Sequence, residues 1–232
     1  MSSHITERVR MRITKSTKDH TSMKLNLFKD LVQECQLAAP GSRLSGKLKK
    51  KIEEIDDCEL KSNAKNLVLY DGDFNSPVMI VGEGPGEKED NLGKPFMGDA
   101  GQLLNKMLEA IKIDRKKIYI TNVVNYRPPN NRKPEPKEIN RYSNFLKEHI
   151  SIIDPKILIL MGSTAMESLF GSKIKISKER GSWKEVIINN KTYLTMITFH
   201  PAYLLRQADQ KKYSWADLKE IRKKIDQLNI II

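Results

Sequence analysis

The chain has 232 residues, with 41 Lys and Arg against 29 Asp and Glu, which gives a formal net charge of +12 at pH 7. Its hydrophobic content of 39% is ordinary for a soluble globular protein, and one domain with a full core is the default at this length. The longest apolar runs, such as Ile157 to Met161, fall far short of the roughly 20 residues that a membrane-spanning helix needs, so the sequence predicts no membrane association.

The positive charge favours a polyanionic partner, because Lys and Arg neutralise phosphates and release their counterions. A lysine-rich soluble protein without such a partner has the same composition. The segment KLKKKIEE at 47–54, for example, is equally consistent with the solvated face of a helix. Charge alone therefore leaves nucleic-acid binding and an ordinary basic surface both open.

The N-terminal part is predicted to be separate from the main domain. Residues 1–22 lack the apolar core and the cleavage site of a secretory signal, and they are interpreted as a basic flexible extension. Amphipathic patterns at 25–37 and 44–58, with a break at 40–42, predict a helical arm over 23–57. The only cysteines, Cys35 and Cys58, lack close pairing or companion histidines, which argues against disulfides and zinc and fits a reducing cytoplasm.

Four apolar, branched runs predict buried strands: Val78 to Gly82, Ile118 to Val124, Ile157 to Met161 and Tyr193 to Phe199. Helical patterns at 100–112, 136–152 and 163–170 lie between them, and a last helix is expected at 214–228. This alternation predicts an α/β fold, a three-layer α/β/α sandwich with a central four-stranded parallel sheet over residues 58–232, plus the N-terminal helical extension.

Polar side chains follow three of the predicted strands. Glu83, Asn122 and His200 each come at or just after the carboxyl end of an apolar run. Parallel sheets bind their ligands beyond these ends. The three residues are therefore expected to share one site.

The sequence then resembles a known family. The segments GEGPGEKEDNLGKPFMGDAGQLLNKML at 82–108, YITNVVNYRPPNNRKPEP at 119–136 and FHPAYLLR at 199–206 are similar, in this order, to the motifs of type-4 uracil-DNA glycosylases. The stretches at 58–74 and 154–169 support the resemblance. It implies a monofunctional glycosylase that flips uracil out of DNA and hydrolyses its N-glycosidic bond, which starts base excision repair.

The resemblance assigns three roles in a uracil pocket. Phe96 would stack on the base, although an isolated Phe is also an ordinary core residue. Asn122 would read the uracil edge, since its amide supplies both a donor and an acceptor; the alternative is a turn former at the strand end. His200 would donate a hydrogen bond to the pyrimidine O2, where negative charge develops as the bond breaks.

An acidic residue is also implied at the pocket. Better-known uracil glycosylases carry a water-activating aspartate where this sequence has Gly84, so Glu83 is the best acidic candidate. The sequence does not separate positioning of water, support of positive charge on the sugar and anchoring of the loop as roles of Glu83. Gly84 is expected to line the substrate pocket. Glu87, Glu89 and Asp90 are interpreted as solvent-facing residues or loop caps.

The basic and apolar residues around these motifs are candidate DNA contacts. A leucine pair followed by arginine suits wedging of a base stack and binding of a phosphate, although one of the leucines can instead pack on the core. Glycine and proline in the first loop would allow close approach to the DNA. The expected contacts are Pro85, Gly86, Arg127, Arg132, Leu204, Leu205 and Arg206.

One feature departs from the family pattern. Type-4 members commonly ligate a [4Fe–4S] cluster through four cysteines, but only Cys58 stands at a matching position here. Ile55, Tyr126 and Tyr142 fall at the other three. The sequence therefore predicts no cluster and no other metal, and it resembles the cluster-lacking branch found in alphaproteobacteria.

The expected partner is uracil-containing DNA, bound by a monomer in the bacterial cytoplasm at the nucleoid. Two alternatives stay open at this point. One is a glycosylase for another deaminated or damaged base. The other is a non-catalytic DNA-binding protein accessory to replication.

Overall fold

The computed structural model describes residues 40–232, of which residues 44–232 form one compact unit that holds the whole sheet. The extension predicted over 1–22 and the helix predicted over 25–37 lie outside the described residues, and the proposed domain boundaries remain predictions.

The described α-helices are α3 (Pro40–Glu53), α4 (Glu59–Asn63), α5 (Glu87–Leu92), α6 (Asp99–Ala110), α7 (Pro136–Ile153), α8 (Ser163–Phe170), α9 (Ile176–Glu179), α10 (Pro201–Arg206) and α11 (Lys211–Gln227). The strands are β1 (Asp71–Gly72), β2 (Val78–Gly82), β3 (Tyr119–Asn122), β4 (Ile157–Met161), β5 (Trp183–Ile188) and β6 (Lys191–Thr198). Three short 3₁₀ turns are η1 (Arg115–Lys117), η2 (Pro129–Asn131) and η3 (Ala208–Gln210).

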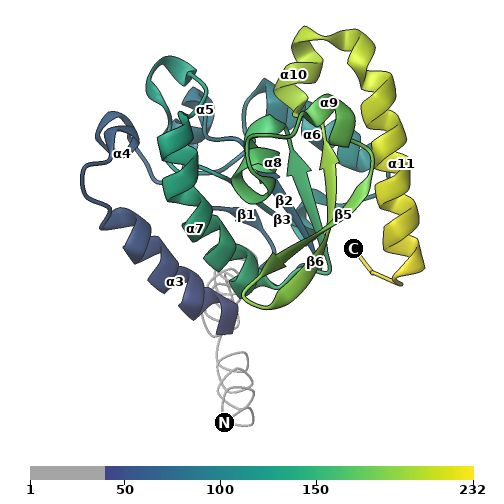
Figure 1. The fold of residues 1–232 in the computed structure, drawn as a ribbon, viewed down its shortest axis with the longest axis horizontal. Helices are drawn as coiled ribbons and strands as arrows, with labels where there is room; N and C mark the ends of the chain where they lie inside the picture. The colour runs from purple at the N-terminus through teal and green to yellow at the C-terminus, as the bar shows by residue number, and fades with distance from the viewer. Residues whose placement is uncertain (1–39) are drawn as a thin grey trace, which may run out of the picture. The chain divides into compact units, whose positions relative to one another are not determined.

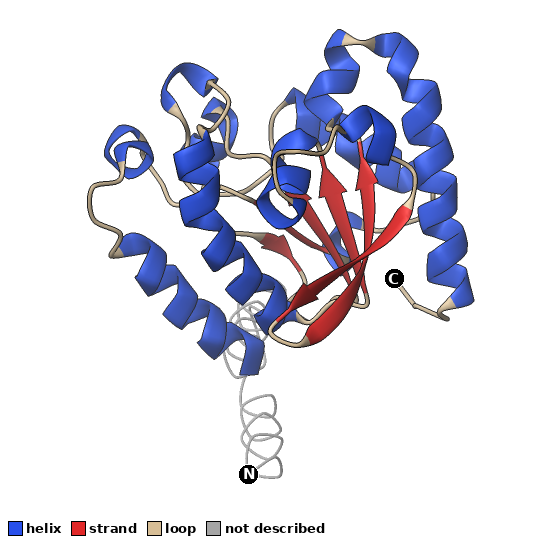
Figure 2. Cartoon of the chain, in the orientation of Figure 1, coloured by secondary structure: helices blue, strands red, loops and turns tan. Residues whose placement is uncertain are grey.

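The strands form one six-stranded sheet in the order β1-β3-β2-β4-β6-β5 (Figure 2). Its inner strands β3, β2, β4 and β6 are parallel, with Ile80 of β2 opposite Ile120 on one side and Ile159 on the other. The predicted four-stranded parallel sheet is confirmed. The edge strands β1 and β5 pair antiparallel and were not predicted.

Strand β5 forms a tight hairpin with β6. Asn189 and Asn190 connect the two strands, and both have positive φ, at 49° and 62°. Two-residue hairpin turns of this kind need left-handed backbone at both positions, which Asn tolerates better than most residues. The alternating exposure of β5 leaves one of its faces to solvent, so it lacks the continuous apolar run that marks the inner strands.

Successive strand residues point to opposite faces of the sheet and build two cores. Met79 and Val81 pack in the core that also contains buried residues of α3, α7 and α8. Val78 and Ile80 pack in the other core, against α6, α10 and α11. Figure 1 shows these helices on the two sides of the sheet. The three-layer α/β/α sandwich is therefore confirmed.

Most predicted helices match the structure within a few residues, and α7 shows why. Pro136 occupies the first helical turn, where its missing N–H costs nothing. The Glu138 carboxylate accepts the backbone N–H of Glu135 at 2.7 Å, which closes a capping box. The predicted break at 40–42 is wrong: α3 begins at Pro40, which suits the first position of a helix. None of the helices in residues 40–232 is long and apolar enough to cross a membrane.

Candidate active site

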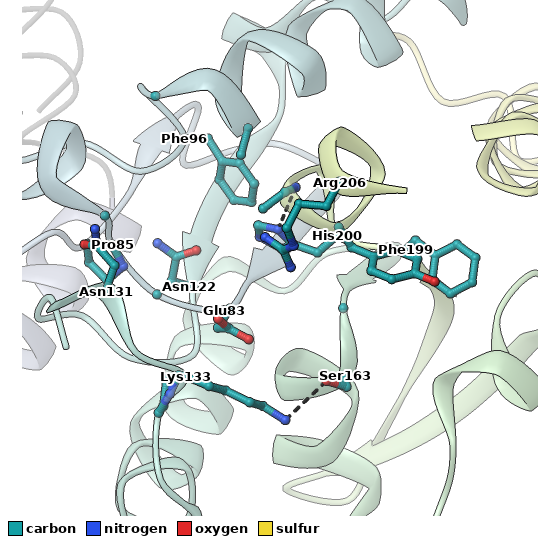
Figure 3. Close-up of a pocket in the computed structure, with 18 of the residues that line it drawn as sticks. Glu83, Pro85, Phe96, Asn122, Asn131, Lys133, Ser163, Phe199, His200 and Arg206 are labelled. Carbon is teal, nitrogen blue, oxygen red and sulfur yellow. Dashed lines mark hydrogen bonds between the residues drawn. The ribbon is translucent and has the colours of Figure 1, made fainter. Parts of the chain in front are cut away.

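The carboxyl ends of the parallel strands open onto a cavity of about 760 Å³ (Figure 3). Because β2, β3, β4 and β6 run in the same direction, the loops after them meet at this edge of the sheet. The predicted residues that line the cavity are Glu83, Gly84, Pro85, Gly86, Phe96, Asn122, Arg132, His200 and Arg206. The convergence of Glu83, Asn122 and His200 expected from the sequence is therefore found.

His200 follows β6 and caps the N-terminus of α10. Its Nδ1 accepts the backbone N–H of Ala202 at 3.2 Å. Burial lowers the pKa of His200 to about 4; the positive charge of Arg206 acts in the same direction, and Glu89 opposes it. The imidazole is thus neutral at pH 7. Because Nδ1 is an acceptor, the proton resides on Nε2, which makes Nε2–H a hydrogen-bond donor at the cavity wall.

Two neighbours fix the position of the imidazole. Gly162, just after β4, has φ of +94°, and a Cβ atom there would lie 3.0 Å from Cβ of His200. Only glycine combines this backbone conformation with such a close approach. The ring of Phe96 also stacks on the imidazole, with 5.4 Å between centroids and 27° between planes.

Phe96 adopts a strained backbone conformation, with φ of 55°. For a bulky residue this conformation is uncommon, and it persists only where the surroundings enforce it. Gly101 of α6 lies directly beneath, since a Cβ atom there would be only 1.8 Å from the Phe96 carbonyl oxygen. Phe96 is 5% exposed and belongs to a core cluster, yet its ring also lines the cavity. Phe96 therefore belongs to the core and lines the cavity at the same time, and its stacking on the base stays a prediction.

Asn122 ends β3 and is 3% exposed. Figure 3 shows its amide between Phe96 and Glu83. The neighbouring residue on β2 is Gly82, where a Cβ atom would lie 2.4 Å from Asn122 Oδ1 and 2.5 Å from Phe96 Cζ. The missing side chain at Gly82 thus leaves the room in which the amide and the aromatic ring meet.

Glu83 is held by a residue that the sequence did not single out. The hydroxyl of Thr164 donates a hydrogen bond of 2.5 Å to Glu83 Oε2, and Thr164 itself is fully buried in the first turn of α8. The segment GST at 162–164 follows the apolar strand β4. Because this segment follows a predicted strand, it falls at the same edge of the sheet as Glu83, and this position was the signal in the sequence that could have pointed to Thr164.

Among the other acidic residues of the first loop, Glu89 caps backbone amides. Glu89 is buried and accepts the N–H groups of Gly86, Met97 and Gly98 at 3.1, 2.8 and 2.7 Å. It therefore joins the two ends of the loop that carries Phe96. The loop-cap interpretation applies to Glu89, whereas the side chain of Glu87 is 69% exposed.

The candidate DNA contacts divide by position. Leu204 packs in a core cluster and is 1% exposed, so it is not free to enter a base stack. Leu205 is 49% exposed and is the only one of the two leucines that can wedge. Arg127 donates from Nε to Asn131 at 2.8 Å and does not line the cavity.

Two cations on the cavity wall already have protein partners. Arg132 makes a two-pronged ion pair with Glu138, at 2.8 and 2.7 Å, so much of its charge is already neutralised. Lys133 lies within 3.3 Å of the Ser163 hydroxyl (Figure 3).

The residues around Cys58 do not fit an iron–sulfur cluster. Cys58 is buried, and its Sγ lies 3.4 Å from the Tyr142 hydroxyl. Burial, and then the nearby Glu53 and Cys58, raise the pKa of the Tyr126 phenol. Two of the positions that the resemblance gives to ligands therefore hold neutral phenols close to this thiol, where a cluster needs thiolates. Within residues 40–232, no three His, Cys, Asp or Glu side chains are grouped as a metal site.

Comparison with known proteins agrees with this geometry. The profile of the uracil DNA glycosylase superfamily matches residues 69–220, and the chain belongs to that superfamily. A type-4 uracil-DNA glycosylase of Thermotoga maritima is 41% identical over 157 residues, which is 67% of this chain and 80% of the relative.

Further relatives define the family more narrowly. A type-4 uracil-DNA glycosylase of Sulfurisphaera tokodaii is 38% identical over 76% of this chain and 82% of its own length. Another, from Pyrobaculum aerophilum, is 38% identical over 69% of this chain and 84% of the relative. The chain is a member of the type-4 uracil-DNA glycosylase family.

Proposed function

We propose that this protein flips uracil out of DNA, hydrolyses its N-glycosidic bond and releases free uracil, which leaves an abasic site. The observation that carries the proposal is the meeting of His200 and Asn122, from the ends of two different strands, in one cavity that Phe96 also lines. Membership of the type-4 family, whose members are named uracil-DNA glycosylases, supports the same activity.

Base recognition needs a stacking surface and a polar edge. Phe96 offers its ring to the face of the pyrimidine. Asn122 offers its amide N–H to a uracil carbonyl and its amide oxygen to the uracil N3–H. Cytosine presents the opposite pattern of donors and acceptors on that edge, so a fixed Asn amide discriminates between the two bases.

Bond cleavage leaves negative charge on uracil and positive charge on the sugar. The electron pair of the C1′–N1 bond moves into the base, and the Nε2–H of neutral His200 stabilises the charge that develops on O2. Water adds to C1′, loses a proton and becomes the new hydroxyl group, while uracil takes up a proton as it leaves. Because the imidazole is already oriented by Ala202, no rearrangement is needed during the reaction.

Glu83 provides the acidic group next to this reaction. Its Oε2 is bound by Thr164, so the carboxylate is fixed at the cavity wall. From there it can orient the attacking water and stabilise the positive sugar. The position used by a water-activating aspartate in better-known uracil glycosylases is Gly84, and a Cβ atom there would lie 2.6 Å from Val124 Cγ2. The local packing therefore favours glycine and leaves Glu83 in the acidic role.

The proposal also covers DNA binding and the absence of a lyase step. Leu205 would enter the base stack, and Arg206, at the cavity wall, would bind a phosphate. Lys88 and Lys94 form ion pairs with Asp99 and Asp71, at 3.1 and 3.4 Å. Neither of these two lysines lines the cavity, and Lys133, which does line it, is paired with Glu167 at 3.5 Å; this arrangement supports a monofunctional enzyme without a lyase step.

We also propose that this member carries no [4Fe–4S] cluster and belongs to the cluster-lacking branch that the sequence resembles. The support is the single thiol of Cys58 beside the phenols of Tyr126 and Tyr142. Iron and acid-labile sulfide should both be well below one atom per protein after anaerobic purification. Stoichiometric iron with a visible charge-transfer band would contradict the proposal.

The remaining proposals concern partners and location. We propose a monomer that acts on uracil-containing DNA at the nucleoid in the bacterial cytoplasm. Sedimentation of the free protein and of its complex with a uracil-containing oligonucleotide tests the monomer.

The decisive experiment is a single-turnover assay on uracil-containing oligonucleotides. His200→Ala should lower the rate about 10²–10³-fold, the usual cost of removing one donor to a developing oxyanion. Asn122→Asp should lose activity on uracil and gain activity on cytosine. Hypoxanthine and hydroxymethyluracil, assayed side by side, test whether uracil is the main substrate. A wild-type protein that leaves uracil in place would falsify the proposal.

A further inference from the structure

Beside the cavity, the corner between η3 and α11 exposes aromatic and basic side chains together. We call this surface the α11 corner and define it as Lys211, Lys212, Tyr213, Trp215 and Lys219, all of which are exposed. Tyr213 and Trp215 are 43% and 45% exposed. Figure 1 shows α11 running from the α10 end of the molecule along one side of the sheet. Lys211, Trp215 and Lys219 stand four residues apart and therefore share one face of α11, where an exposed aromatic ring lies between two lysines.

A row of stacked groups connects this corner to the cavity wall. Phe199 lines the cavity, and the guanidinium of Arg180 lies 5.6 Å from the centre of its ring. The same guanidinium lies 5.3 Å from the ring centre of Tyr213, and Lys212 Nζ lies 5.2 Å from that centre. Tyr213 and Lys212 of the α11 corner are therefore continuous with the pocket wall, and a strand that leaves the pocket past them reaches the first turns of α11.

The charge of the segment is strongly positive. Residues 206–224 contain seven Lys or Arg and three Asp or Glu. One of the three acids, Asp217, is buried against Arg180 and so adds no negative charge to the surface. The first turn of α11 holds two lysines and no acidic residue. Positive side chains at the positive end of the helix dipole destabilise the helix, so these lysines are not there for stability. Binding of DNA phosphates would give them a function.

We propose that the α11 corner binds the single-stranded segment of DNA next to the flipped nucleotide, with the lysines on its phosphates and Trp215 stacked on an unpaired base. Tyr213 already lies against Arg180 and Lys212, so it serves as the platform that holds Lys212 in place. The only cation near the Trp215 ring is Lys219, at 6.0 Å, among the contacts of the described residues. Stacking selects an unpaired strand, because paired bases do not offer their faces. The inference depends on the proposed function in one respect, which is that the DNA strand leaves the described pocket next to the flipped nucleotide.

Fluorescence tests the stacking directly. The chain has two tryptophans, so the full-length Trp183→Phe protein reports on Trp215 alone. Titration with a uracil-free single-stranded oligonucleotide should quench the emission in a saturable way. In the otherwise unaltered chain, Trp215→Ala should raise the Kd for that strand about tenfold, whereas Trp215→Phe should retain most of the affinity. For a blunt duplex of the same sequence, Trp215→Ala should change the Kd less than twofold.

The salt dependence of binding tests the lysines. Losing two phosphate contacts should lower the slope of log K against log salt by about 1.4 for a single strand, and this is expected for the Lys211→Ala/Lys212→Ala double variant. The matched control is Lys116→Ala/Lys117→Ala, two exposed lysines before the amino end of β3, at the opposite edge of the sheet, which should leave the slope unchanged.

Unchanged emission together with an unchanged Kd for Trp215→Ala would overturn the proposal, as would an equal loss of affinity for duplex and single strand. Uracil release by the wild type is measured separately. If the wild type does not release uracil but the Trp215 emission is quenched, the proposed function is wrong and the α11 corner still binds single-stranded DNA. If the wild type releases uracil but no quenching is seen, only the proposal for the α11 corner is wrong.

Discussion

The hydrogen bond from Thr164 to Glu83 makes a sharp test of how the acidic group is held. Thr164→Val keeps the size and branching of the side chain and removes only the hydroxyl that donates to Glu83 Oε2 at 2.5 Å. Because Thr164 is fully buried, no water replaces the hydroxyl at its own position. We expect the carboxylate to lose its fixed orientation and the rate of uracil release to fall.

The size of the effect follows from the strength of that bond. A hydrogen bond to a charged group contributes about 1.5–3 kcal/mol, which converts to a rate factor of about 10 to 150 if the whole interaction is lost in the transition state. Glu83 is only partly buried and lines the cavity, so water can replace part of the lost interaction. The lower end, about tenfold, is therefore expected.

Single-turnover rates on a uracil-containing oligonucleotide measure this effect, and urea unfolding measures stability in parallel. Thr164→Ser is the matched control, since it keeps the hydroxyl and removes a methyl group. It should retain most of the rate while losing about 1 kcal/mol of stability. Should the valine variant stay within twofold of wild type, or the two variants be equally slow, the hydroxyl does not hold Glu83 in the way described.

Three further predictions concern titration and packing. The pKa of His200 is lowered to about 4, so the single-turnover rate should stay level between pH 8 and about pH 5.5; a step with a midpoint near pH 6.5 would contradict a neutral imidazole. Burial also lowers the pKa of His149 to about 4 in the folded protein. In the unfolded chain this histidine binds a proton below about pH 6.5. The free energy of unfolding should therefore decrease as the pH falls from about 6.5 toward 4, by up to about 1.4 kcal/mol per pH unit. Urea unfolding at several pH values should show a shallower dependence for His149→Gln. Leu204→Ala should cost about 2–5 kcal/mol of stability. Leu205→Ala should change stability by less than about 0.5 kcal/mol and slow uracil release from duplex DNA. The reverse pattern would show that Leu205 is the core residue and Leu204 the wedge.

The inner sheet was readable from the sequence because its strands are buried on both faces. Each appears as a short apolar run, three of the four carry a polar residue at or just after their carboxyl end, and parallel pairing brings all such ends to one edge. For this reason the meeting of Glu83, Asn122 and His200 could be predicted from spacing. The edge strand β5 could not, because it is half exposed and depends on its hairpin with β6.

The sequence by itself determined the fold class, the edge of the sheet that carries the site and the family motifs, since these follow from local periodicity and residue type. Only the tertiary structure decided which imidazole nitrogen carries the proton, which leucine is exposed and what holds Glu83. These depend on burial and on partners such as Thr164, which lies 81 residues away from Glu83 along the chain. Contacts of that range arise when the layers pack together, and no local pattern encodes them.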